Sequence, residues 1–72
     1  MKLFVDNGRE GIRIEISSLS VHSSLTFVTV SNTNRTRNAL LNAVRVGLVS
    51  SFEVRGEEVK VAFYTKYVQE IL

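Results

Sequence analysis

The sequence predicts a small α+β domain, a two-layer structure in which one main helix packs on a three- to four-stranded sheet ending in a β-hairpin. Three patterns lead to this prediction. Apolar and charged residues alternate near the amino terminus, a central segment has helical periodicity, and two β-rich runs near the carboxyl end flank a short charged turn. With 72 residues, we expect a single domain, residues 1–72, in which residues 28–67 form a helix-plus-hairpin unit.

The first predicted element is a hairpin that pairs Lys2–Val5 with Ile12–Ile16. In the second of these segments isoleucine alternates with a charged residue, which is the period of a half-buried strand. Asp6, Asn7 and Gly8 supply a turn between the two segments. The following segment, residues 17–24, contains five serines and fits a loop, a strand or a short helix.

The central part of the chain predicts a strand followed by the main helix. Leu25–Val30 is rich in β-branched and aromatic residues, which favour a strand. Residues 32–34 offer consecutive helix-capping side chains, and Arg35–Val46 has one apolar face and one polar face. Gly47 then supplies the left-handed residue that ends a helix.

The carboxyl-terminal part predicts a hairpin of Val49–Val54 and Val59–Tyr67, joined by a loop at residues 55–58. Val68–Leu72 is expected to be a terminal stub. Apolar residues of the helix and the hairpin recur with the periods of their elements, which predicts a shared core. The expected core residues are Leu40, Leu41, Val44, Phe52, Val54, Val59, Val61 and Phe63.

Composition argues against several classes of function. The chain has no cysteine and a single histidine, His22, so we expect no disulfide, no metal site and no cofactor. Serines flank His22 in the sequence, but side chains so close in sequence rarely meet in the geometry of a catalytic triad. Glu57 and Glu58 are adjacent carboxylates in a predicted exposed loop, which favours a solvated pair over an acid–base pair. We therefore expect that the protein is not an enzyme, has no small-molecule substrate and contains no membrane-spanning segment. Because its core is small, we expect that a partner stabilises it.

Two polar surfaces are candidates for binding. Between Asn32 and Phe52 the chain carries three arginines and no acidic residue, although the formal net charge is only +2. Four residues at spacings of three, four and three form a polar stripe on the predicted helix: Arg35, Asn38, Asn42 and Arg45. Guanidinium and amide groups suit phosphate and ribose, but a solvated helix face has the same composition. The second surface consists of Lys60, Tyr64 and Lys66. It suits stacking of a base with phosphate contacts, or its lysines merely protect an edge strand from pairing with another chain.

Residues 28–67 contain an ordered series of motifs that resembles the amino-terminal half of the bacterial-type small-subunit ribosomal protein eight family. The series comprises a strand that ends in a Pro-x-Ser/Thr element, a helix, a Gly-aromatic-Ile element, an aromatic-x-Val strand and a hairpin that returns through Leu-Lys-Tyr. The matching segments are Val28–Thr33, with Ser31 where proline is usual, Arg35 near the helix start, Gly47–Val49, Phe52–Val54 and Lys66–Tyr67, with Thr65 replacing leucine. Ile16–Ser20 is similar to a shortened form of the family's first helix.

The resemblance implies a component of the small ribosomal subunit that binds ribosomal RNA and neighbouring ribosomal proteins. By position it implies RNA contacts for Thr33, Arg35 and Lys66. The residue chemistry described above adds further candidates: Arg37, Asn38, Asn42, Arg45, Lys60 and Tyr64. The family's second domain has no counterpart in this sequence, so the resemblance implies a shortened or split organellar form of the protein. The expected location is a ribosome, either in the mitochondrion or in the cytoplasm.

Two other classes of non-enzymatic protein remain open. One is a small protein–protein interaction module of viral or plasmid type, which would use an exposed strand edge and could be a homodimer. The other is a small DNA-binding protein. A ribbon-helix-helix dimer would need a second helix, but the sequence after Gly47 favours β-structure.

Overall fold

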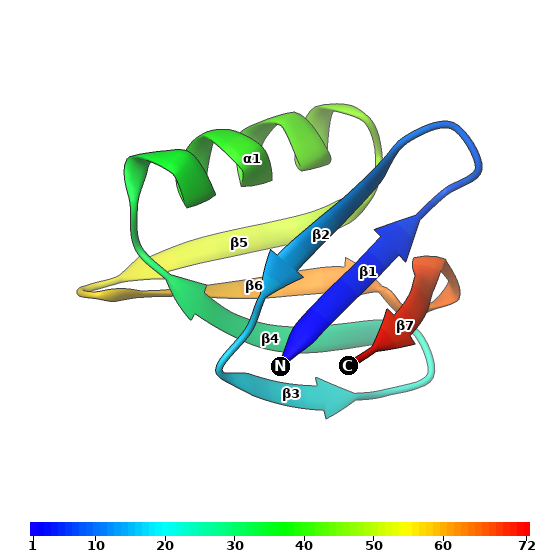
Figure 1. Cartoon of the computed structure of the whole chain (residues 1–72), viewed down its shortest axis with the longest axis horizontal. Helices are drawn as coiled ribbons and strands as arrows, with labels where there is room; N and C mark the ends of the chain where they lie inside the picture. Colours follow the sequence, from blue (N-terminus) through cyan, green and yellow to red (C-terminus); the bar gives the residue numbers. More distant parts are fainter.

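The computed structural model describes all 72 residues and confirms the predicted α+β class. One α-helix and one short 3₁₀ helix accompany seven strands (Figure 1). In chain order the elements are β1 (Lys2–Asp6), β2 (Gly11–Glu15), β3 (Ser18–Val21), β4 (Leu25–Ser31), α1 (Asn34–Arg45), β5 (Val49–Arg55), β6 (Glu58–Tyr64), η1 (Thr65–Tyr67) and β7 (Val68–Ile71).

The strands form two antiparallel sheets that are joined by bends in the chain. The three-stranded sheet has the order β2-β1-β7, and the four-stranded sheet has the order β3-β4-β6-β5. At the first bend, the Ile16 amide donates to the Met1 carbonyl (2.8 Å) and the next amide, that of Ser17, donates to the Thr29 carbonyl (2.9 Å). The segment between β2 and β3 therefore changes its hydrogen-bonding partner from β1 to β4 within two consecutive residues. Few backbone amide and carbonyl groups are left without a partner at this bend.

The core lies between the two sheets, because alternate side chains of each strand point inward. The inward residues of β1, β4 and β6 are almost completely buried, and α1 contributes Leu40 and Ala43. Figure 1 shows α1 running alongside β5 at one side of the molecule. The twelve core residues are Leu3, Val5, Ile16, Val28, Val30, Leu40, Ala43, Leu48, Val49, Val59, Val61 and Phe63.

Both ends of α1 carry the capping groups that the sequence predicts. The Thr33 hydroxyl accepts a hydrogen bond from the Thr36 amide (3.1 Å), as an N-cap side chain does. At the other end Gly47 has φ 83°, and the Leu48 amide donates to the Ala43 carbonyl (2.9 Å). This arrangement is a Schellman motif, which satisfies free carbonyl groups at the helix end. The helix bounds are therefore set by local chemistry.

Thr33→Ala is expected to lower the free energy of unfolding by about 1 kcal/mol, because it removes the acceptor for one free amide of the first turn. Urea denaturation followed by circular dichroism would measure the loss. Asn38→Ala, on an exposed position in the middle of α1, is the matched control and is expected to be neutral or slightly stabilising. Equal stability of the two variants would show that the cap contributes nothing.

The segment left open in the sequence, residues 17–24, contains strand β3, and the helix implied for Ile16–Ser20 is wrong. Ser18–Val21 pairs with β4 in a continuous antiparallel register, so its backbone groups form hydrogen bonds with those of β4. The side chains of Leu19 and Val28 lie directly opposite each other in this register. The short alternation of serine with apolar residues is thus a strand pattern. The sequence did not predict it because serine also favours turns and helix caps.

The predicted return strand Val59–Tyr67 is too long, and the stub predicted for Val68–Leu72 is wrong. Strand β6 ends at Tyr64, where the chain turns through η1. The Thr65 hydroxyl donates to the His22 carbonyl (2.7 Å) and lies 2.8 Å from the Thr26 hydroxyl oxygen. These bonds fix the turn and direct the following residues into β7, which pairs with β1.

The predicted core is correct for four residues, because Leu40, Val59, Val61 and Phe63 are buried. Phe52 is only half-buried. The prediction is wrong for three residues: Leu41 is 55% exposed, Val44 is 41% exposed and Val54 is 47% exposed. Helix α1 contacts mainly β5, at the edge of the four-stranded sheet, so only a narrow stripe of the helix is covered.

Candidate nucleic-acid interface

The polar stripe predicted for the helix exists as one exposed face of α1. An α-helix turns about 100° per residue, so residues at these spacings project within one quadrant. Leu40 and Ala43 are the buried residues of the same helix and project from the other side. The four residues of the stripe, which we call the α1 basic face, are all exposed: Arg35, Asn38, Asn42 and Arg45.

The arginines of the helix have no carboxylate partner within the molecule. The ion pairs in the structure join the amino terminus to Glu15 (3.9 Å) and Arg55 to Glu53 (3.1 Å). Helix α1 itself contains no acidic residue that could offset the positive charge of its arginines. The cationic groups of the α1 basic face are therefore free to bind an external anion.

Thr33 and Arg37 lie beside this face but have structural partners. The Thr33 hydroxyl caps the helix, and the Arg37 guanidinium donates to the side-chain oxygens of Asn32 and Asn34. Arg37 is half-buried, whereas Arg35 is exposed. These bonds hold the guanidinium of Arg37 at the start of α1, where it adds positive charge next to the basic face.

A groove between α1 and β2 extends the cationic surface beyond the predicted residues. Its volume is about 420 Å³, and Lys2 and Arg13 line it together with Arg35. Glu15 also lines the groove, but its carboxylate lies close to the amino-terminal ammonium group. Sequence reasoning missed Lys2 and Arg13, because only the packing of α1 beside β2 brings these residues next to the helix.

The other three predicted residues lie on a different surface. Lys60 and Tyr64 project from β6 on the outer face of the four-stranded sheet, away from the core. The Lys60 ammonium donates to the Thr29 hydroxyl (2.9 Å), and the Tyr64 ring meets Tyr67 edge-on with centroids 6.0 Å apart. Lys66 belongs to η1 and lies 5.1 Å from the Tyr67 ring centroid, so its predicted place on the same strand is wrong.

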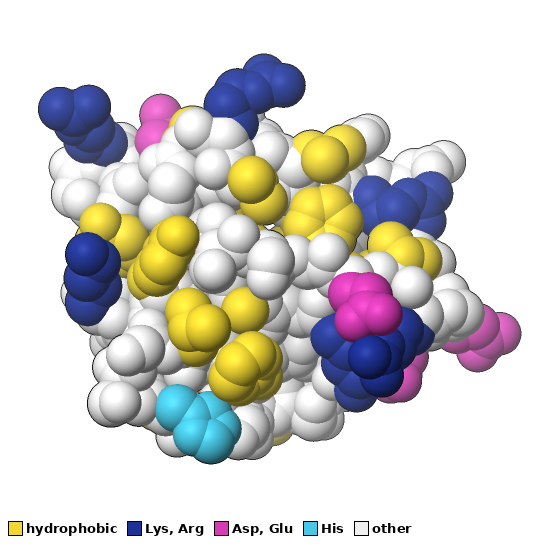
Figure 2. All heavy atoms as spheres, turned by 180° about the vertical axis from the view of Figure 1, so that it is seen from behind, with side chains coloured by type: hydrophobic (Ala, Val, Ile, Leu, Met, Phe, Trp, Pro, Cys, Tyr) yellow, Lys and Arg dark blue, Asp and Glu magenta, His cyan; other side chains and the backbone are white.

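The nine predicted residues thus divide between two surfaces. Six lie on or next to α1, which packs on the inner side of β5, and three lie on or near the opposite face of that sheet. The outer sheet face has mixed charge, because Lys60 lies opposite Glu53 in the register and Arg55 lies opposite Glu58. Figure 2 shows basic and acidic side chains next to each other on this face. The α1 basic face has one sign of charge and is therefore the better surface for a polyanion.

The fold and this surface define a small α+β chain with a cationic helix face. No protein-family model, no curated protein and no solved structure matches the chain. None of its helices has the length and apolar character needed to cross a membrane.

Proposed function

We propose that this protein is a non-enzymatic RNA-binding module that contacts the ribose-phosphate backbone through the α1 basic face and the adjoining groove. The observation that carries this proposal is the set of exposed guanidinium and amide groups on one helix face without an internal carboxylate partner. Because salt bridges within the molecule do not compete for these groups, they can bind phosphate oxygens from solution.

The side chains on this face match the groups that an RNA duplex exposes. A-form RNA has a wide, shallow minor groove lined with ribose hydroxyls and phosphates, and its base sequence is difficult to read. Guanidinium groups bind phosphate in a two-pronged geometry, and the amides of Asn38 and Asn42 can donate to and accept from ribose hydroxyls. Arg35 and Arg45 are ten residues apart, so the face is about 15 Å long and spans several phosphates.

The proposal includes a place in the small ribosomal subunit, among ribosomal RNA and neighbouring ribosomal proteins. The order strand, helix, strand, strand over β4, α1, β5 and β6 supports this part of the proposal, because the resemblance implies the same order. The strand at Ser18–Val21 differs from the helix that the resemblance implies there. The RNA-binding proposal itself depends on the charge of α1 and not on the resemblance.

An RNA partner would also stabilise the fold. Only 15 of the 72 residues are buried, so the core is small, and a partner that binds only the folded chain raises its stability by mass action. The melting temperature of the protein should therefore rise as the fraction of protein bound to RNA increases.

Chemical-shift mapping of the ¹⁵N-labelled protein with a short RNA duplex tests the proposal. We expect saturable shifts of the backbone amides of Arg35, Asn38, Asn42 and Arg45, with further shifts at Lys2 and Arg13. Strand β7 lies away from α1 in the three-stranded sheet and serves as the internal control.

Shifts confined to residues outside α1 and its groove, or no saturable shifts at all, would contradict the proposal. A DNA duplex of the same sequence distinguishes the DNA-binding alternative. Tighter binding to DNA than to RNA would favour that alternative, because RNA alone offers the 2′-hydroxyl to the two asparagines.

A further inference from the structure

The outer face of the four-stranded sheet presents an exposed aromatic ring, that of Phe27. Phe27, on the inner strand β4, is 46% exposed, although it lies away from the edges of the sheet. In the strand register Phe27 lies between Ser20 of β3 and Ala62 of β6, and Ala62 is followed by Ser51 of β5. The row across the sheet thus places only small side chains beside the ring.

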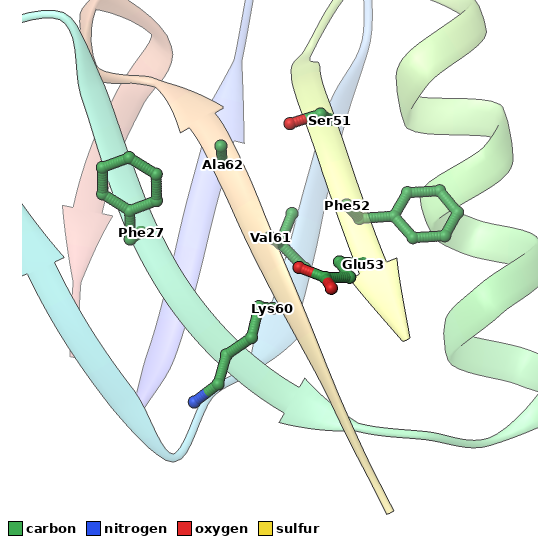
Figure 3. A pocket seen from close by; sticks show the side chains of 7 residues that line it. All are labelled: Phe27, Ser51, Phe52, Glu53, Lys60, Val61 and Ala62. Atoms are coloured by element: carbon green, nitrogen blue, oxygen red, sulfur yellow. The ribbon is translucent and has the colours of Figure 1, made fainter. Parts of the chain in front are cut away.

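These small neighbours leave space next to the ring. Phe27 and Lys60 together line two shallow hollows, of about 200 Å³ and about 470 Å³. The first lies over β5 and β6 and includes Ser51 and Ala62, as Figure 3 shows. Phe52 and Glu53 also line this hollow, although the ring of Phe52 points toward α1 (Figure 3).

The second hollow lies over β3 and β4 and is framed by polar groups. Ser18, Ser20, Thr29, Arg55 and Lys60 line it beside Phe27. Every strand of this sheet therefore contributes a hydroxyl or a charged group to one of the two hollows. A ring flanked by hydroxyls and cations can recognise a flat, polar heterocycle that bears a phosphate.

His22 supports the ring from one direction. Its imidazole meets the Phe27 ring edge-on, with centroids 5.6 Å apart and an interplanar angle of 74°. The Ser20 hydroxyl oxygen lies 3.0 Å from His22 Nε2, which orients the imidazole. Figure 2 shows the histidine at the rim of the hydrophobic side chains on this face. The contact restricts the orientation of Phe27 before any ligand arrives.

We propose that this face binds an unpaired nucleobase, which stacks on Phe27 while Lys60 contacts an adjoining phosphate. Stacking on an exposed aromatic residue of a sheet suits any base, and nearby cations follow the backbone. This inference rests on the proposed RNA-binding function and extends it from the duplex backbone to a single strand. The hydroxyl and cationic groups around the ring favour a base with its phosphate over a protein partner, whose interface would centre on an apolar area.

A binding experiment with short single-stranded RNA tests this site. The probes are a fluorescein-labelled eight-nucleotide RNA and an abasic oligomer of the same length, followed by fluorescence anisotropy. We expect Phe27→Ala to weaken binding of the RNA about tenfold, since stacking of one base contributes about 1–3 kcal/mol. Binding of the abasic oligomer should not change, and Phe27→Trp should restore binding of the RNA.

Val21→Ala is the matched control. Val21 is 54% exposed, but it pairs with buried Thr26 and therefore lies on the other face of the sheet. Circular dichroism of each variant confirms that it is folded. Equal binding of the RNA by wild type, Phe27→Ala and Val21→Ala would overturn the inference, as would equal affinity of the wild type for RNA and the abasic oligomer.

The outcomes separate this inference from the proposed function. If the wild type fails to bind an RNA duplex but binds the single strand in a Phe27-dependent way, the proposed function of α1 fails and the stacking site stands. If duplex binding is normal and Phe27→Ala has no effect on the single strand, only the stacking site fails. If sedimentation shows a homodimer that Phe27→Ala dissociates, the face is a self-association surface and the inference is overturned.

Discussion

Phe63→Ala is expected to lower the free energy of unfolding by about 3–5 kcal/mol. The Phe63 side chain is fully buried on the inner side of β6, between its register partners Thr26 and Val49 on the flanking strands. Truncation of a buried phenylalanine costs about 3–5 kcal/mol through lost burial and the cavity that remains. A domain of this length has a total stability of about 4–11 kcal/mol at typical values per residue. One substitution therefore removes a large share of the total.

Thermal and urea unfolding followed by circular dichroism would measure this loss. Phe27→Ala is the matched control, because it deletes the same atoms from the same sheet at an exposed position. We expect the control to lose less than about 1 kcal/mol, since surface substitutions usually have small effects. Similar losses for Phe63→Ala and Phe27→Ala would contradict the placement of the core between the two sheets.

Arg35→Gln combined with Arg45→Gln is expected to weaken binding of an RNA duplex at least about tenfold at near-physiological salt. Each guanidinium that neutralises a phosphate releases counterions, so the loss of two such contacts lowers the affinity strongly. Glutamine keeps a polar side chain and a good helix propensity, so the helix should persist. Fluorescence anisotropy with a labelled duplex would measure the change.

Arg9→Gln combined with Arg55→Gln is the matched control for net charge. Arg9 lies in the exposed β1–β2 turn and Arg55 is paired with Glu53, so neither belongs to the α1 basic face. The control removes the same formal charge and is expected to change the affinity only slightly. Equal losses for the two double variants would indicate a general charge effect in place of a defined binding face.

Much of the fold could be predicted because local chemistry determines it. The alternation in Ile12–Ile16 predicted the amino-terminal hairpin, and the observed register pairs β1 with β2 over their full length. The capping side chain of Thr33 and the positive φ of Gly47 delimit a helix that was predicted within one residue at each end. These features depend on contacts between residues close in sequence.

The parts that were not predicted depend on contacts between distant segments. Strand β3 is stabilised by its pairing with β4, and β7 by its pairing with β1 at the opposite end of the chain. The turn at Thr65 depends on hydrogen bonds to Thr26 and His22. No local pattern in residues 65–71 reports these partners, so periodicity alone extended β6 too far.

The same distinction applies to the binding surfaces. The α1 basic face could be predicted because helical spacing alone places its residues together. The contribution of Lys2 and Arg13 required the position of the helix beside β2. The exposure of Phe27 also required tertiary structure, because its sequence neighbours Thr26 and Val28 are buried and give the segment the composition of a core strand.

The salt dependence of RNA-duplex binding tests the central claim most directly. The slope of log K against log[salt] changes by about 0.9 for each phosphate contact on a double-stranded nucleic acid. We predict that Arg35→Gln with Arg45→Gln makes the slope shallower by about 1.8, whereas Arg9→Gln with Arg55→Gln leaves it close to the wild-type value. Identical slopes for the wild type and the Arg35/Arg45 variant would contradict the claim that α1 binds the RNA backbone.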